Sequence, residues 1–453
     1  MDKFLQIGIW ISIFITGVVF KVPFDFYLYY FFFFGGYPYL LSRYGLSKRM
    51  LLILGSFLVI GFVFVITGDN KPFNLIKVWF GVFLSYSFYY MYLKHIKFQT
   101  FQVMEMYLKG SYVAGIVAVS QQIFYKLHFP LGYNYNIFLL GYKWGNLNDM
   151  EPVMGLGRAG SLISEPSSYA MVVAPAVFIV ICSLIYKDLR IDFLKKHHKF
   201  FIVFGYILSM SSTAFLGFGV MALLLLINTA SFRQVVLSFA LLIGLGYGAL
   251  NYNEAFYKRF NAINKLMSVD ISKLINKNTG IISNEVYNSS FILYANYDVA
   301  YKNFKKHPIT GTGMGSHPIA FEKYSFFKLL RDEYKNNMNN QDANSLFNRL
   351  MSETGLIGLS VFFFIIFRFY LRKNKKIQDP RYWLYNNAIL VIIVLFLIRQ
   401  GNYFFTGFPL FVWMYYFNWK NLQNERKKQA QLSPIAAPVS PTEEDIDNDT
   451  KEN

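Results

Sequence analysis

The sequence has very little of what a soluble or secreted enzyme needs. It contains one cysteine, Cys182, inside an apolar run, so one chain can build neither a disulfide framework nor a cysteine-rich metal site. Charged residues make up 15% of the 453 residues, whereas 54% are hydrophobic and 20% are aromatic. One soluble core cannot absorb that much apolar surface, so the composition predicts a protein that contacts lipid.

Signatures of nucleotide and nucleic-acid chemistry are also missing. The sequence has no P-loop, no dinucleotide fingerprint and no His-rich or paired-cysteine metal site. The formal net charge is +18, but Lys and Arg fall mostly between apolar runs, so the charge indicates membrane topology and not nucleic-acid binding. If the chain is an enzyme, we expect a substrate that is already activated and lies in the membrane.

Apolar runs dominate what is present. Spans of about 17 to 25 residues cross a hydrocarbon layer of ~30 Å, and we assign twelve candidate spans at residues 4–20, 24–41, 50–67, 73–93, 110–128, 168–186, 200–210, 213–229, 232–250, 355–371, 384–399 and 402–418. The stretch 201–230 is too long for one span and is interrupted at Ser211-Ser212-Thr213, which predicts two. The first run has no small-residue cleavage site after it and predicts a retained span. The sequence therefore predicts an all-α polytopic membrane protein of about twelve helices.

Orientation follows from the short connections. Those after every second span carry clusters such as Arg43, Lys48 and Arg49, whereas the alternate ones, including 69–72, are poor in positive charge. Because cytoplasmic loops retain Lys and Arg, both termini should be cytoplasmic and the long segments 129–167 and 251–350 should lie outside. We expect one transmembrane domain over residues 1–420 and a disordered cytoplasmic tail over 421–453, where Ala, Ser, Pro and acidic residues replace the apolar ones.

The first long segment ends with residues suited to a helix start. Proline fits the first helical turn and a carboxylate suits the positive helix end, so Glu165-Pro166 predicts the beginning of a span. Arg158 precedes it by a few residues, near the water interface. A guanidinium there either holds a phosphate bidentately or anchors the helix at the lipid headgroups. Glu165 is either a structural cap or a base.

The second long segment contains a glycine-rich turn. Gly311, Gly313 and Gly315 alternate with other residues, and His317 follows them. Such a turn either aims backbone amides at an anion or is simply flexible. His317 is either a base or hydrogen-bond donor to a sugar, or a solvated loop residue. Arg399, at the outer end of the eleventh span, either snorkels to the interface or faces the bundle interior.

These motifs resemble those of one family. Arg158, Gly160, Glu165-Pro166 and Ala170 before one span, Gly311 to Gly315, and Asn344-Ser-Leu with Glu353-Thr-Gly-Leu-Ile-Gly358 before another, resemble the O-antigen polymerase (Wzy) family, within the O-antigen polymerase/ligase superfamily. The resemblance covers the whole membrane part. It implies a GT-C-like membrane glycosyltransferase of the bacterial inner membrane, with two large periplasmic loops.

The resemblance also implies a reaction and its partners. Such an enzyme polymerises undecaprenyl-pyrophosphate-linked repeat units into a surface polysaccharide, O-antigen or capsule, at the periplasmic face. It needs no cofactor, metal or nucleotide sugar. The implied partners are the lipid-linked glycan donor and acceptor, the lipid bilayer and a chain-length regulator, with no nucleic acid.

Roles for individual residues follow from that reaction. We expect Arg158 and Arg399 to stabilise the leaving pyrophosphate, and His317, Glu165 and Glu353, in that order, to orient or deprotonate the acceptor hydroxyl. Gly313, Gly315 and Asn344 complete the expected substrate-binding set. A histidine commonly precedes the asparagine in the ligase-like pattern, whereas Ala343 stands here. This difference favours polymerase over ligase.

Three alternatives remain at the level of sequence. One is an O-antigen ligase-type glycan transferase. Another is a twelve-helix transporter, because residues 42–49 superficially resemble the basic loop of the major facilitator family. That family, however, places its long connection in the cytoplasm between two similar halves. A lipid-linked sugar flippase is the third, although it should carry charges in a central cavity and smaller outer loops.

Overall fold

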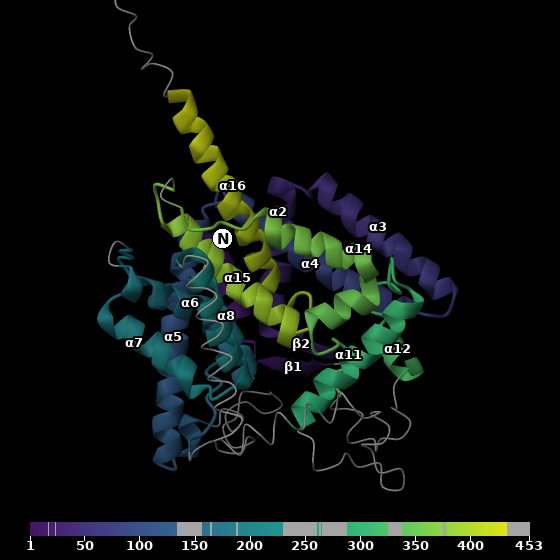
Figure 1. The fold of residues 1–453 in the computed structure, drawn as a ribbon, viewed down its shortest axis with the longest axis horizontal. Helices are drawn as coiled ribbons and strands as arrows, with labels where there is room; N and C mark the ends of the chain where they lie inside the picture. The colour runs from purple at the N-terminus through teal and green to yellow at the C-terminus, as the bar shows by residue number, and fades with distance from the viewer. Residues whose placement is uncertain are drawn as a thin grey trace, which may run out of the picture.

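The chain folds into a bundle of helices (Figure 1). The computed structural model describes residues 1–16, 18–22, 24–133, 156–163, 165–186, 189–229, 261, 264, 288–324, 338–374 and 377–432. The elements in this part are α1 Asp2–Phe14, β1 Val19–Val22, β2 Phe24–Tyr27, α2 Leu28–Tyr44, α3 Lys48–Ile66, α4 Pro72–His95, α5 Thr100–Lys126, η1 Pro130–Gly132, α6 Pro166–Ile185, α7 Lys196–Leu208, α8 Ser212–Thr229, α11 Asn288–Lys306, α12 His317–Tyr324, α14 Leu346–Arg368, α15 Arg381–Arg399, η6 Phe405–Gly407 and α16 Phe408–Leu432.

Within the described residues, four helices are long and apolar enough to cross a membrane: α3, α6, α14 and α15. α6 and α15 pack against each other and are mostly buried, whereas only 17% of the apolar stretch of α3 is covered by protein. A helix that is apolar on all sides and this exposed needs lipid around it. The helices thus agree with a polytopic membrane protein, while the number twelve stays a prediction.

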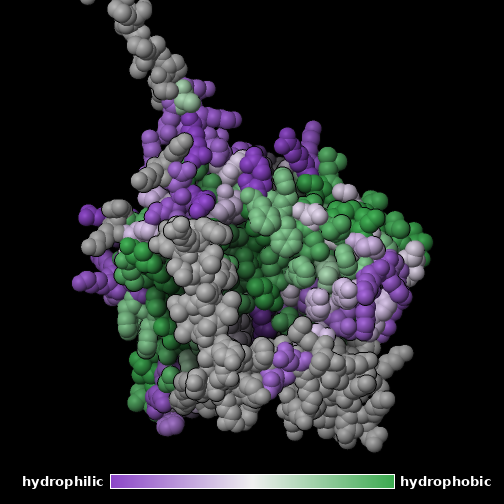
Figure 2. Space-filling model, viewed as in Figure 1, coloured by the Kyte–Doolittle hydropathy of each residue, from purple (hydrophilic) through white to green (hydrophobic). Residues whose placement is uncertain are grey.

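The surface is divided in the way a membrane requires. Figure 2 shows hydrophobic residues across the middle of one face, over α14 and α3. Hydrophilic residues gather at the end of α16 and, on the other side of the hydrophobic area, around α12. Exposed apolar side chains in α3 and α14 include Leu52, Ile66, Phe364 and Phe367. This arrangement suits a hydrocarbon layer between two aqueous faces.

The helix boundaries test the predicted spans. The division at 211–213 is confirmed, because α7 ends at Leu208 and α8 begins at Ser212. The ends of the first two spans are wrong, since β1 and β2 pair as an antiparallel hairpin with Val19 opposite Tyr27. Short runs of β-branched and aromatic residues do not distinguish strand from helix by hydrophobicity. The predicted span 232–250 lies outside the described residues.

The tail begins later than its composition predicts. α16 continues to Leu432, so residues 421–432 are helical and not part of a disordered tail. Their side chains, from Asn421 to Leu432, include Gln, Glu, Arg, Lys and Ala, which are good helix formers even where they are exposed. Residues 433–453 lie outside the described part, as do 134–155 and most of 251–287 in the two long segments.

Two segments that the charge pattern assigns to one side of the membrane meet in the structure. The connection between α3 and α4 contacts the segment 307–324: Lys323 Nζ lies 2.6 Å from Asp69 Oδ1, and Asn70 Nδ2 donates to the Met314 carbonyl at 3.0 Å. Burial raises the pKa of Asp69, but the hydrogen bond and charge of Lys323 outweigh it, and the pKa lies below its usual value.

Site-directed labelling tests this orientation. In a Cys182→Ala background, we expect Lys71→Cys to react with a membrane-impermeant thiol reagent added to intact spheroplasts. Lys196→Cys, at the start of α7, should react only after permeabilisation, because its loop is rich in positive charge. Both residues are exposed, so access and not burial sets the result. Labelling of Lys196→Cys from outside would contradict the topology.

Candidate functional site

α14 is broken where the resemblance motif lies. Gly355 has φ 59° and ψ −151°, which interrupts the helix and removes backbone hydrogen bonds. The segment 308–313 replaces them, because its carbonyls and amides pair with the broken turn: Leu356 N to Pro308 O at 2.8 Å, Ile357 N to Ile309 O at 3.0 Å, Thr312 N to Ser352 O at 3.2 Å and Gly313 N to Glu353 O at 2.8 Å. Irregular backbone inside a membrane protein requires such pairing.

The glycine-rich turn packs tightly against this break and against two helices. Gly313 and Gly315 have φ of 88° and 78°. A Cβ on Gly313 would lie 2.6 Å from the Gly61 Cα in α3, and one on Gly315 would lie 2.5 Å from the Asn74 carbonyl oxygen in α4. Any side chain there would force the turn away from the helices. The glycines therefore hold the 307–318 segment close to α3, α4 and α14.

A buried ion pair lies one turn before the break. Arg349 Nε donates to Glu353 Oε1 at 3.1 Å, and the two residues are 3% and 0% exposed. Tyr403 donates its hydroxyl to Glu353 Oε2 at 3.0 Å, and its ring lies 4.3 Å from the Arg349 guanidinium carbon. Arg349 Nη1 also donates to the Gly401 carbonyl at 3.1 Å. We call Arg349, Glu353 and Tyr403 the buried charge cluster.

A cavity of about 290 Å³ opens beside this cluster. It is lined by Asn74, Lys77, Val78, Gly315, Pro318, Asn339, Asn340, Gln341, Asp342, Arg349, Asn402 and Phe404. Arg349 lines the cavity. Its Nε and Nη1 donate to Glu353 and Gly401, whereas its Nη2 makes no hydrogen bond within the described residues. Lys77 of α4 adds an exposed ammonium. The cavity thus combines two cations with amides and one carboxylate, Asp342, a set that suits an anionic polar ligand.

His317 is buried behind the cavity and neutral. Burial, together with the charge of Arg349, lowers the pKa of its imidazole to about 3. Asn296 donates through Nδ2 to two carbonyls, so its oxygen accepts from His317 Nε2 at 3.1 Å. The backbone amide of His317 lies 3.5 Å from Glu353 Oε1. His317 therefore contacts the buried charge cluster directly through its backbone.

Asp342 lies at the end of a strained turn on the cavity wall. Burial raises the pKa of its carboxyl; the Asn344 amide and the charge of Arg349 lower it, and Glu165 raises it again, for a net increase. The next two residues, Ala343 and Asn344, have φ of 58° and 55°, a conformation that costs free energy for side chains of this kind. Asn344 Oδ1 accepts from Asn339 at 3.4 Å. Asn344 thus supports the turn that carries Asp342.

The remaining predicted residues lie around this centre at different distances. Glu165 is the N-cap residue of α6, but its carboxylate accepts no backbone amide of the helix. Its charge acts on both Asp342 and Arg399, the last residue of α15. Arg158 belongs to the segment 156–163, whose Ser161 bonds Gln121 of α5. Neither arginine is among the residues that line the cavity. The structure brings Glu165, Arg399, His317 and Glu353 near the site and holds Arg158 on a neighbouring segment.

Sequence reasoning missed several residues of the cavity and of the buried charge cluster. Arg349 lies four residues before Glu353, a spacing that pairs side chains on one helical face, so the ion pair could have been found. Asp342, Tyr403 and Lys77 carry no such signal. Asp342 lies in the turn before α14, Tyr403 in the turn after α15, and Lys77 in the first turns of α4. Only the tertiary fold brings these three places together.

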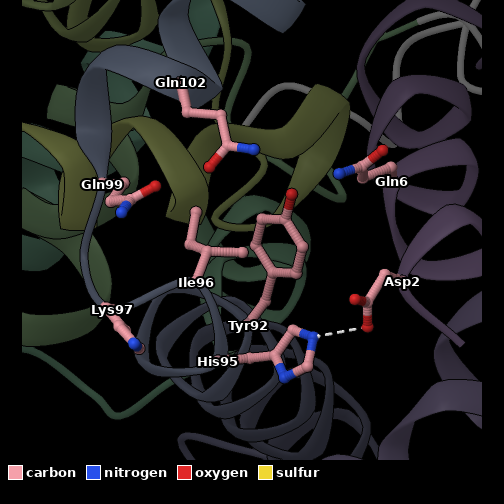
Figure 3. Close-up of a pocket in the computed structure, with 8 residues that line it drawn as sticks. All are labelled: Asp2, Gln6, Tyr92, His95, Ile96, Lys97, Gln99 and Gln102. Carbon is pink, nitrogen blue, oxygen red and sulfur yellow. Dashed lines mark hydrogen bonds and ion pairs between the residues drawn. The ribbon is translucent and has the colours of Figure 1, made fainter.

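A second cavity, of about 260 Å³, lies at the other end of α4 (Figure 3). Asp2, Gln6, Tyr92, His95, Ile96, Lys97, Gln99 and Gln102 line it. His95 lies 2.9 Å from Asp2 Oδ1 and 2.8 Å from the Tyr44 hydroxyl. At 1.5 Å per residue, the helix separates Lys77 from His95 by about 27 Å, most of a bilayer. None of the residues predicted for the site lies in it.

The buried charge cluster should govern stability as well as chemistry. We expect Arg349→Met or Glu353→Gln to lower the free energy of unfolding by about 3–5 kcal/mol, because each leaves an unpaired buried group. The double variant should lose much less than the sum of the two. Thermal unfolding of the detergent-purified variants measures this. Additive losses would show that the two side chains do not form a coupled pair.

Gly401 offers a sharper test of the cavity wall. A Cβ there would overlap the Asp342 carbonyl oxygen, so Gly401→Ala must displace the Asp342 turn and the carbonyl that Arg349 binds. We expect loss of activity and a lower unfolding midpoint. Gly219→Ala in α8 is the matched control, because nothing lies within 4 Å of its Cβ and alanine favours a helix. An active Gly401→Ala protein would argue against the cavity as the site.

Comparison with known proteins identifies the segment that builds the cavity. Residues 199–363 match the family model described as O-antigen ligase. This range contains the buried ion pair, the glycine-rich turn and seven cavity residues: Gly315, Pro318, Asn339, Asn340, Gln341, Asp342 and Arg349. No curated protein matches the chain. Because the match is confined to residues 199–363, it shows that this segment is similar to the O-antigen polymerase/ligase superfamily.

Proposed function

We propose that the chain polymerises undecaprenyl-pyrophosphate-linked oligosaccharide repeat units into a surface polysaccharide, and that the cavity beside Arg349 is where the glycan is transferred. The observation that carries this proposal is a buried guanidinium that keeps one free nitrogen on a polar cavity, with Lys77 beside it. The reaction needs a fixed positive charge where a pyrophosphate leaves.

The buried charge cluster supports that role physically. Glu353, Tyr403 and the Gly401 carbonyl hold the guanidinium of Arg349 in one orientation, so no reorganisation is needed when negative charge develops on the leaving group. Guanidinium groups form strong charge-assisted hydrogen bonds to phosphate oxygens and stay charged at every working pH. Lys77 adds a mobile ammonium that can follow the second phosphate.

The surroundings favour a lipid-linked substrate. α4 contributes Asn74 and Lys77 to the cavity, and α14 contributes Arg349. Large apolar side chains of the same two helices are exposed, among them Phe73, Ile76 and Phe364. A polyprenyl chain in the bilayer can therefore lie against apolar helix faces while its pyrophosphate reaches the cavity. Its glycan would extend toward the segments 288–324 and 338–345.

Location and partners follow from the same proposal. The protein would lie in the bacterial inner membrane with both termini cytoplasmic and the cavity at the periplasmic face. Its substrates would be the lipid-linked donor and acceptor, and a chain-length regulator would set how many repeats are added. Arg158 and Arg399 would contact pyrophosphate or glycan at the edge of the site, with Gly313, Gly315 and Asn344 shaping its wall.

A ligase is the second candidate, because the matching family model carries that description. The two reactions share the donor and the leaving group and differ in the acceptor. A polymerase transfers to another lipid-linked repeat unit, whereas a ligase transfers to the sugar of a lipid A core. The absence of a histidine at Ala343 favours the polymerase.

Reconstitution with defined substrates tests both candidates. We expect the full-length protein in proteoliposomes to convert a synthetic lipid-linked repeat unit into a ladder of longer lipid-linked glycans without added nucleotide or metal. Arg349→Lys should lower the rate by about 10²–10³-fold, since one ammonium cannot keep the bonds to Glu353 and Gly401 and also present a fixed donor to the cavity. Product length is read on gels. Transfer only to an added lipid A core would establish a ligase, and no product with either acceptor would contradict both proposals.

The outer arginines have a separate test. Arg158→Ala and Arg399→Ala should each shorten the polymer or slow its formation while membrane insertion stays normal. Glu425→Gln on the opposite end of the molecule serves as a control. Unchanged polymer length in both arginine variants would remove these residues from the site without affecting the case for Arg349.

A further inference from the structure

Transfer of a glycan requires that the attacking hydroxyl lose a proton, and one carboxylate on the cavity wall is placed to take it. This inference rests on the proposed function. Asp342 lines the cavity together with Arg349 and Lys77. Its Oδ1 accepts the backbone amide of Asn344 at 3.0 Å, and within the described residues no other residue donates a hydrogen bond to its second oxygen. That oxygen is therefore free to accept a proton from a bound sugar.

The turn that carries Asp342 is held rigidly. The carbonyl of Ala343 accepts from Asn348 Nδ2 at 3.3 Å, and the Ser345 hydroxyl donates to the Leu397 carbonyl of α15 at 2.7 Å. Gly401 lies against the Asp342 carbonyl so closely that a Cβ would not fit. Two successive residues with positive φ persist only where surrounding contacts enforce them, and such strain is typical of functional sites.

Other candidates for the base are less suitable. Both oxygens of Glu353 already accept hydrogen bonds, from Arg349 and Tyr403. His317 is completely buried, and its Nε2 is bonded to Asn296. Glu165 is exposed and accepts from the Ser167 hydroxyl at 3.1 Å, and it does not line the cavity. Asp342 thus combines a free oxygen with direct access to the cavity.

We propose that Asp342 is the general base of the transfer. The acceptor hydroxyl oxygen forms a bond to the anomeric carbon of the donor glycan, and the bond from that carbon to the pyrophosphate oxygen breaks. The pyrophosphate leaves with the electron pair and is stabilised by Arg349 and Lys77. The proton of the hydroxyl moves to the free oxygen of Asp342 and then to water.

The charged groups around Asp342 set how its rate depends on pH. Arg349 faces it from α14, Lys77 lines the same cavity from α4, and Glu165 acts from the start of α6. Burial raises the pKa of Asp342 above its ordinary value. A base works in its deprotonated form, so the rate should rise with pH through this raised pKa and level off above it.

The decisive experiment compares pH–rate profiles of isosteric variants in proteoliposomes with the synthetic lipid-linked repeat unit. Asp342→Asn keeps an oxygen that can accept the Asn344 amide, and it should slow transfer by about 10²–10⁴-fold. The acid limb of its pH–rate profile should be lost, while binding of the donor is retained. Asp342→His should recover part of the rate and move the acid limb to higher pH. Glu105→Gln, an exposed residue of α5 paired with Lys109 and not among the cavity residues, is the control.

The possible outcomes separate this inference from the proposed function. If Asp342→Asn keeps the wild-type rate and pH–rate profile while Arg349→Lys loses activity, Asp342 is not the general base. The proposed polymerase function would still stand. Loss of the acid limb in Glu165→Gln but not in Asp342→Asn would assign the base to Glu165 and overturn the inference. If the wild-type protein makes no product, the proposed function itself fails. If Asp342→Asn misfolds, the pH–rate profile of Asp342→His tests the inference instead. An acid limb at higher pH than in the wild type supports Asp342 as the base, and an unchanged limb contradicts it.

Discussion

The buried pair of Arg349 and Glu353 is the interaction on which the candidate site depends. Two opposite charges can remain in the interior of a helical membrane protein only if each finds the other and the remaining donors and acceptors are satisfied. Here Tyr403, the amide of His317 and the carbonyl of Gly401 are the further partners, and Arg349 keeps Nη2 for the polar cavity that it lines. The pair and its partners come from three segments, so satisfying one ion pair fixes the positions of α14, the 307–318 segment and the turn after α15.

The break at Gly355 is the backbone counterpart of that pair. A helix that ran straight through residue 355 would leave the segment 308–313 without partners for its own amides and carbonyls. Because the broken turn and the glycine-rich segment satisfy each other, the outer segment is tied to a membrane helix by backbone hydrogen bonds. Side chains on both, including Gly315 and Arg349, then border the same cavity.

The two ends of the helical bundle serve different purposes. Lys373 lies 3.5 Å from the ring centre of Tyr186, and Arg381 lies 4.7 Å from that of Phe101. Such cations over aromatic rings suit a membrane interface, where one side of the ring is apolar and the other is wet. At the opposite end, Arg349 is paired with the buried carboxylate of Glu353 and lines the cavity together with Lys77. The first end thus has contacts typical of a membrane interface, and chemistry is proposed for the second.

The sequence by itself determined that this is a helical membrane protein, because long apolar runs and the distribution of Lys and Arg are one-dimensional properties. It also separated α7 from α8, and its motifs pointed to residues near the site, among them His317, Glu353 and Gly315. It did not predict the hairpin at residues 19–27, since a short apolar run suits strand and helix equally. Only the tertiary structure decided that Asp342, Tyr403 and Lys77 meet Arg349, because residues so distant in sequence become neighbours through helix packing and through the need of a buried charge for partners.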